Sequence, residues 1–110
     1  MQAHNELGNG FLEKVYENAL ALDLRANGHD VWQQKEIDVI YHGECVGVYI
    51  PDLIVDGQVI VEVKAVRAID EIFMAQCKNY LKATGLDVCL LINFGQPSLV
   101  FKRILRKPIR

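Results

Sequence analysis

Residues 49 to 65, YIPDLIVDGQVIVEVKA, constrain the fold more than any other stretch, because they read as two apolar β-strands joined by a tight turn at the Asp-Gly pair 56–57. Three charged side chains, Asp52, Glu62 and Lys64, interrupt these apolar strands. Burying a carboxylate or an ammonium costs free energy unless another group compensates its charge. We therefore expect a compensating group at this hairpin.

The composition of the chain indicates a single globular domain over residues 1–110. Hydrophobic residues make up 51% of the chain and charged residues 24%, the balance of a folded protein and not of a disordered one. No apolar run reaches the roughly 18 to 20 residues that a membrane-spanning helix needs, and the N-terminus lacks the pattern of a signal peptide. The cysteines, Cys45, Cys77 and Cys89, fit no zinc motif, and we expect packed, reduced thiols in a cytoplasmic protein.

The periodicity of apolar residues predicts an α/β fold with a mixed sheet flanked by helices and an extra C-terminal strand. Helices are expected to end at Gly28 and at Gly85, since glycine favours the residue after a helix. The predicted order is helix 10–28, strands 29–43, 44–55 and 58–66, helix 68–85, and strands 86–95 and 98–105.

The length of the hairpin loop decides whether the two acids of the hairpin meet. A two-residue loop places Asp52 opposite Val61, facing away from Glu62. A three-residue loop, or a bulge near Pro51, places Asp52 opposite Glu62, with about 5 Å between their Cβ atoms. We favour the second register. Two facing carboxylates repel each other, and a cation between them removes the repulsion, so we expect Mg²⁺ or Mn²⁺.

Lys64 lies two residues beyond Glu62 on the same face of its predicted strand. Its ammonium could orient a water molecule or neutralise charge that develops on a phosphoryl group. The alternative is that Lys64 only forms a salt bridge with Glu62 or Asp52.

Helical wheels at about 100° per residue place further candidates on the inner faces of both predicted helices. In the first helix Glu13 falls on the apolar side, whereas Glu17 falls on the solvent face. In the second helix Gln76 and Tyr80 fall in the middle of the apolar face, and a buried glutamine needs hydrogen-bond partners. A structural ion pair for Glu13 and a structural hydrogen-bond bridge for Gln76 are the alternatives.

Two motifs resemble those of a known family. Pro51-Asp52, nine further residues and then Glu62-Val63-Lys64 resemble the PD-(D/E)XK signature of the restriction-endonuclease-like nuclease superfamily. Residues 10–16, GFLEKVY, match the G-x-x-E-x-x-Y motif that names the GxxExxY family within that superfamily. The segments HNELGNGFLEKVYENAL, VEVKAV, QCKNYLKATG and LLINFG are similar to that family in the same order, so the resemblance spans nearly the whole chain.

The resemblance implies a restriction-endonuclease-like αβββαβ core with the active site on the central hairpin. Asp52 and Glu62 would be metal ligands, helped by the backbone carbonyl of Val63. Lys64 would act on the nucleophilic water.

The resemblance also implies roles for residues of both helices. Glu13 would correspond to the acid of the first helix, either as a metal ligand or through a water molecule. Gln76 and Tyr80 match a Q-x-x-x-Y element beside the site. The family usually has about a further half-helix before the position of His4, so the first helix could be short and Glu13 less firmly held. We treat His4 as a surface or capping residue.

These observations favour a metal-dependent nuclease that hydrolyses phosphodiester bonds of nucleic acid, with DNA as the expected substrate. The alternative is a non-catalytic nuclease-like module that binds nucleic acid or a protein partner. The charge distribution supports the alternative, because all 14 acidic residues lie before residue 102 and residues 1–101 therefore carry a net charge of −7.

The C-terminal tail has the opposite charge, with five of the 12 basic residues among the last nine. These candidate phosphate contacts are Lys102, Arg103, Arg106, Lys107 and Arg110. A homodimer could build a nucleic-acid channel from two such tails. A solvated terminal strand is the simpler alternative.

Overall fold

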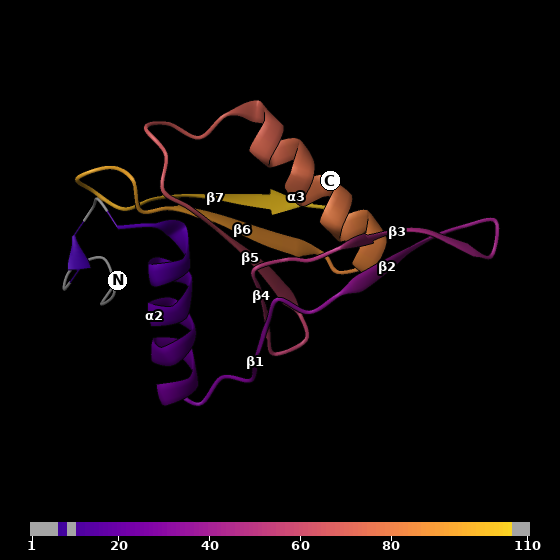
Figure 1. Cartoon of the computed structure of the whole chain (residues 1–110), viewed down its shortest axis with the longest axis horizontal. Helices are drawn as coiled ribbons and strands as arrows, with labels where there is room; N and C mark the ends of the chain where they lie inside the picture. The colour runs from indigo at the N-terminus through magenta and orange to yellow at the C-terminus, as the bar shows by residue number, and fades with distance from the viewer. Residues whose placement is uncertain (1–6, 9–10, 107–110) are drawn as a thin grey trace.

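A five-stranded mixed sheet with one helix on each side forms the body of the structure, a computed structural model that describes residues 7–8 and 11–106 (Figure 1). The helices are α2 (Glu13–Ala26) and α3 (Glu71–Thr84). The sheet contains, in spatial order, β1 (Val31–Gln33), β4 (Leu53–Val55), β5 (Val59–Lys64), β6 (Val88–Asn93) and β7 (Val100–Leu105). The parallel pair β5–β6 is connected through α3, and the other neighbours are antiparallel. The predicted fold class, including the extra C-terminal strand, is confirmed.

Two strands that we predicted as continuous are each broken. The segment 29–43 divides into β1 and β2 (Ile37–Tyr41), and the segment 44–55 divides into β3 (Glu44–Tyr49) and β4. The first break begins at Gln34, whose backbone is left-handed with φ 56°. The second contains Pro51, which has no N–H to donate to a sheet ladder. Between these breaks, β2 and β3 form a separate two-stranded ribbon that extends away from the sheet (Figure 1).

Alternating side chains of β5 divide the core into two layers. On the α2 side, Tyr16 stacks on Phe94 with ring centroids 4.5 Å apart. On the α3 side, Cys77 and Leu81 pack against β5 and β6 in a second buried cluster. The first cluster comprises Tyr16, Leu20, Ala21, Val31, Leu53, Val55, Val61, Val63, Ile92 and Phe94, and the second comprises Ile54, Ile60, Cys77, Leu81, Cys89, Leu91 and Ile104.

Both helices end where predicted but are rotated relative to their predicted orientations. Gly28 follows the end of α2 with φ 87°, and Gly85 ends α3 with φ 75° and donates its N–H to the carbonyl of Leu81. In α2, Glu17 is buried, so its placement on the solvent face was wrong. In α3, Gln76 is exposed, so its predicted burial was also wrong. Apolar residues occupy a broad arc of each helix, and packing against the sheet selects which part of the arc is buried.

Two further predictions concern the cysteines and membrane-spanning helices. Cys77 and Cys89 are buried thiols as expected, but Cys45 is exposed on the ribbon, contrary to the expectation of a packed side chain. Among the described residues, no helix combines the length and the apolar character of a membrane span. His4, Gly10, Lys107 and Arg110 lie outside the described residues.

Candidate metal and active site

The connection between β4 and β5 contains three residues, 56–58, and this length sets the register of the hairpin. Val55 pairs with Val59, so the same register continued past the end of β4 brings Asp52 opposite Glu62. The turn uses the expected Asp-Gly pair, whose φ angles are 54° and 64°. The N–H of Gln58 closes this turn on the carbonyl of Val55 at 3.0 Å. Gln58 is therefore the extra residue that shifts the pairing, and the register that we favoured is confirmed.

Asp52 and Glu62 are joined by hydrogen bonds across the hairpin. The N–H of Asp52 donates to Oε1 of Glu62 at 3.1 Å, and the N–H of Val63 donates to Oδ2 of Asp52 at 2.8 Å. Glu62 is only 4% exposed, and Asp52 lies partly buried in a bend directly before β4. Each acid is thus held by a backbone group of the other strand.

The environment of the two carboxylates disfavours their simultaneous ionisation. Burial raises the pKa of Glu62 to about 9, and the neighbouring carboxylate of Asp52 adds to this rise. Burial also raises the pKa of Asp52, while the hydrogen bond from Val63 opposes the rise and the carboxylate of Glu17 adds to it. Such a pair is stabilised by a positive charge beside both groups, so the donor set fits a hard divalent cation.

The protein ligands of such a cation would be few. Within residues 7–8 and 11–106, no group of three or more His, Cys, Asp or Glu side chains is arranged to hold a metal ion. Mg²⁺ retains several water molecules and is usually held by one or two carboxylates. Asp52 and Glu62 are a donor set of this size, and their role as metal ligands, like that of the Val63 carbonyl, stays a prediction.

Lys64 lies at the end of β5 on the same side of the strand as Glu62, and it is half-buried. Its Nζ is 4.8 Å from the ring centroid of Phe73 in α3, a cation–π arrangement. The described ion pairs do not include Lys64, so the structure does not support the alternative of a direct salt bridge with Asp52 or Glu62. Its positive charge nevertheless lowers the pKa of both acids. The ammonium is thus close to the acids and not paired with either of them.

Glu13 is the first residue of α2 and is exposed. The N–H of Ala65, directly after β5, donates to its Oε1 at 3.4 Å. The first helix therefore does bring an acid to the end of the strand that carries Glu62 and Lys64. A role for Glu13 as a metal ligand stays a prediction.

Glu17 is a buried acidic residue close to Asp52, although the sequence predicted it on the solvent face of its helix. It is 3% exposed and accepts hydrogen bonds from Lys14, Gln33 and Gln34. Its charge reaches Asp52, whose pKa it raises. The helical wheel gave no signal for this placement, because Glu17 shares the polar side of the sequence pattern with Lys14.

Of the two site residues predicted in α3, Tyr80 is partly buried and Gln76 is exposed. The Tyr80 ring packs edge-on against Tyr49 with centroids 5.1 Å apart. Burial raises the pKa of the Tyr80 hydroxyl, and the charges of Glu62 and Asp52 raise it further, which places this hydroxyl near the acidic pair. Gln76 lies on the exposed side of α3, and no described hydrogen bond connects it to the acids.

Comparison with known proteins shows the family of the chain and solved structures with a similar fold, two of which are described here. The family model of the PD-(D/E)XK nuclease superfamily matches residues 1–104. An alkaline exonuclease from Laribacter hongkongensis has a similar fold, with a TM-score of 0.62 and 19% identity over 86% of this chain and 56% of that one. The protein SSO0001 has a TM-score of 0.63 and 17% identity over 88% of this chain and 50% of that one. This chain thus spans about half the length of both, and no curated protein matches it.

Proposed function

Because the chain belongs to the PD-(D/E)XK nuclease superfamily, we propose that it is a divalent-metal-dependent nuclease whose active site comprises Asp52, Glu62 and Lys64. The observation that carries the proposal is the hairpin register, which sets two carboxylates with raised pKa values side by side beside an unpaired ammonium. Placing Asp52 beside the buried Glu62 costs desolvation and repulsion that a bound cation offsets.

In this proposal Asp52 and Glu62 hold Mg²⁺ or Mn²⁺, helped by the Val63 carbonyl. The bound cation supplies Lewis-acid stabilisation of the charge on the phosphate. Lys64 donates a hydrogen bond to the attacking water or to a phosphoryl oxygen, where its fixed charge stabilises the transition state. Packing against Phe73 restricts the Lys64 side chain and keeps its ammonium near the acids.

The neighbouring residues have supporting roles in the proposal. Glu13 contacts the metal through a water molecule, since it is exposed at the end of β5. The Tyr80 hydroxyl, beside the acidic pair, donates a hydrogen bond to substrate or water, and Gln76 contacts substrate from the exposed side of the same helix. These assignments follow the GxxExxY family, to which we propose that the chain belongs.

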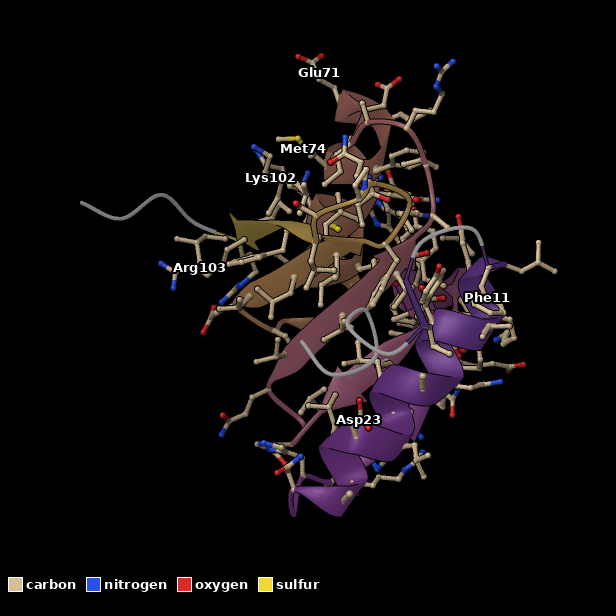
Figure 2. All side chains as sticks on the ribbon, turned by 90° about the vertical axis from the view of Figure 1, so that its left-hand side faces the viewer. Phe11, Asp23, Glu71, Met74, Lys102 and Arg103 are labelled. Atoms are coloured by element: carbon tan, nitrogen blue, oxygen red, sulfur yellow. The ribbon has the colours of Figure 1, made fainter. Side chains whose placement is uncertain are left out.

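We propose DNA as the substrate, with Lys102 as its phosphate contact on the site side of the sheet. Glu62 of β5 pairs with Leu91 of β6, and Leu91 pairs with Lys102 of β7, so the three residues form one row across the sheet. Neighbouring strands are about 4.8 Å apart, which places the Lys102 backbone roughly 10 Å from that of Glu62. Arg103 alternates to the opposite face (Figure 2) and could reach DNA that a second copy of the chain holds.

Arg106 is less available as a phosphate contact. Its guanidinium donates to Oδ1 of Asp87 at 2.9 Å, an exposed ion pair. The basic tail is thus divided in the structure and does not form one continuous surface over its described residues. A homodimer that joins two Lys102 faces stays part of the proposal.

Cleavage of labelled single- and double-stranded DNA and RNA in the presence of Mg²⁺ or Mn²⁺ tests the proposal. We expect wild-type protein to cleave DNA and Asp52→Asn to be inactive, because the variant removes one metal-binding charge with little change in volume. Glu71→Gln is the matched control, since Glu71 begins α3 on the surface and projects away from the body (Figure 2). Equal cleavage by wild type and Asp52→Asn would refute the proposal.

The acidic body of the chain favours a second candidate, a nuclease-like module that binds a partner without cleavage. Titration calorimetry with Mn²⁺ separates the two candidates. The nuclease requires metal binding that Glu62→Ala abolishes, together with cleavage. Mn²⁺ binding that Glu62→Ala abolishes, without cleavage of single- or double-stranded DNA or RNA, would instead favour the non-catalytic module.

A further inference from the structure

The carboxylate of Glu17 is held more completely than any other acid near the candidate site. Its Oε1 accepts from Nε2 of Gln34 at 2.8 Å, and its Oε2 accepts from Nε2 of Gln33 at 2.7 Å. The ammonium of Lys14, one helical turn earlier, contacts both oxygens at 3.1 Å. Glu17 is 3% exposed, so these bonds replace its hydration. They fix a buried negative charge at a defined point on α2.

Gln34 has a backbone conformation that an ordinary turn does not explain. Its φ is 56°, a region that side-chain-bearing residues rarely adopt. The other described residues of this kind, His42 and Asp56, lie in hairpin turns and are each followed by a glycine, whereas Gln34 lies at the break between β1 and β2. Strained backbone of this sort is retained where the surrounding contacts require it, and it is found at functional sites.

The Gln34 side chain connects the buried acid of α2 to the candidate metal ligand. Besides donating to Glu17, its Nε2 donates to Oδ1 of Asp52 at 3.3 Å, and its backbone N–H donates to the Asp52 carbonyl at 3.0 Å. The second carboxylate oxygen of Asp52 is held by the N–H of Val63. Both oxygens of Asp52 are therefore oriented, one by β5 and the other by an amide that Glu17 anchors.

We propose that Glu17 and Gln34 are a positioning pair for the candidate site: Gln34 orients the Asp52 carboxylate for a divalent cation, and Glu17 fixes Gln34. The geometry supports this chain of contacts because the Nε2 atom of Gln34 has two protons and two carboxylate acceptors, one on each side. Groups that orient metal ligands typically contribute about 10- to 100-fold to metal affinity.

This inference rests on the proposed function, so its test measures metal binding directly as well as cleavage. Gln34→Gly removes the amide and also suits the left-handed backbone, which separates loss of the side chain from backbone strain. Glu17→Gln removes the charge while keeping the shape. We expect each variant to weaken Mn²⁺ binding by about tenfold or more in calorimetry, and to raise the Mn²⁺ concentration for half-maximal cleavage without an equal fall in kcat at saturating metal. Glu71→Gln should bind Mn²⁺ as wild type does.

The double variant Glu17→Gln/Gln34→Gly tests whether the two residues act through each other. If Glu17 acts through Gln34, the double variant loses no more Mn²⁺ affinity than Gln34→Gly alone. Losses that multiply would overturn the proposed order of contacts. Urea unfolding, followed by the fluorescence of Trp32, the one tryptophan of the chain, reports folding in the same samples.

The outcomes also separate this inference from the proposed function. Variants that unfold more easily but bind Mn²⁺ with wild-type affinity when folded would show a merely structural pair and refute the inference. Wild-type binding that is weak and equal to that of Asp52→Asn would instead refute the proposed metal site itself. Restored affinity in Gln34→Asn, which keeps an amide and tolerates a left-handed backbone, would add support.

Discussion

Replacing Glu62 with glutamine should stabilise the metal-free protein at neutral pH, because the carboxylate is buried in a place that resists its ionisation. Burial and the Asp52 charge raise the folded pKa of Glu62 from 4.5 to about 9. Below pH 4.5 Glu62 is protonated in both the folded and the unfolded chain, so its ionisation does not oppose folding. As the pH rises toward 9, the unfolded chain ionises first and gains stability relative to the folded one.

The size of the effect follows from the pKa difference. Each pH unit above the unfolded pKa lowers the free energy of unfolding by about 1.36 kcal/mol while the folded group stays protonated. At pH 7 the wild-type protein has lost about 3 kcal/mol in this way, as an order of magnitude. Glu62→Gln keeps an oxygen that accepts the N–H of Asp52 and has no proton to lose, so it avoids this loss.

Urea unfolding of both proteins in a metal chelator, at several pH values between 4.5 and 8.5, measures the difference. We expect the variant to match wild type near pH 4.5 and to exceed it increasingly up to pH 8.5. Excess Mn²⁺ should reverse the order, since only wild type gains from the cation. A stability difference that does not change with pH would refute the reasoning, because it would show that Glu62 ionises as easily in the folded chain as in the unfolded one.

Three further predictions follow from particular contacts. Lys64→Met should lower the rate of DNA cleavage by about 100-fold or more with unchanged Mn²⁺ affinity in calorimetry; a lost affinity would instead make Lys64 part of the metal site. Gly95→Ala should lower the free energy of unfolding by about 1 to 3 kcal/mol, because the added Cβ would lie 2.4 Å from backbone atoms of Val66; wild-type stability in urea would mean that this close approach relaxes freely. Lys102→Ser should reduce the slope of log DNA affinity against log salt by about one, whereas Arg103→Ser should leave a monomer's slope unchanged; equal effects would contradict the assignment of one face to DNA.

The local pattern of the sequence was sufficient to predict both helices, the last three strands and the hairpin face that carries the charges, but not the breaks that separate β2 and β3 from the main sheet. Alternation along β5 placed Glu62 and Lys64 on one side, since successive strand residues point to opposite faces whatever surrounds them. Gly28 and Gly85 correctly marked the ends of the helices, because a left-handed residue after a helix favours glycine in any fold. These properties depend on neighbours in the chain, which the sequence contains.

The sequence was consistent with two registers of the hairpin, one for a two-residue loop and one for a three-residue loop. The Asp-Gly pair predicts a turn but does not determine whether Gln58 belongs to the loop or to the strand. Pairing of Val55 with Val59 settles the question in favour of the three-residue loop, and with it the meeting of Asp52 and Glu62. A shift of one residue would have sent Asp52 to the opposite face.

The rotation of the helices was decided by the tertiary structure alone. The periodicity of α2 and α3 left a broad apolar arc, and packing on the sheet exposed Gln76 and buried Glu17. Glu17 is tolerated there because Gln33 and Gln34, 16 and 17 residues away in the chain, supply its hydrogen bonds. Burial of a polar group depends on partners that are distant in the sequence, and only the folded chain shows which residues these are.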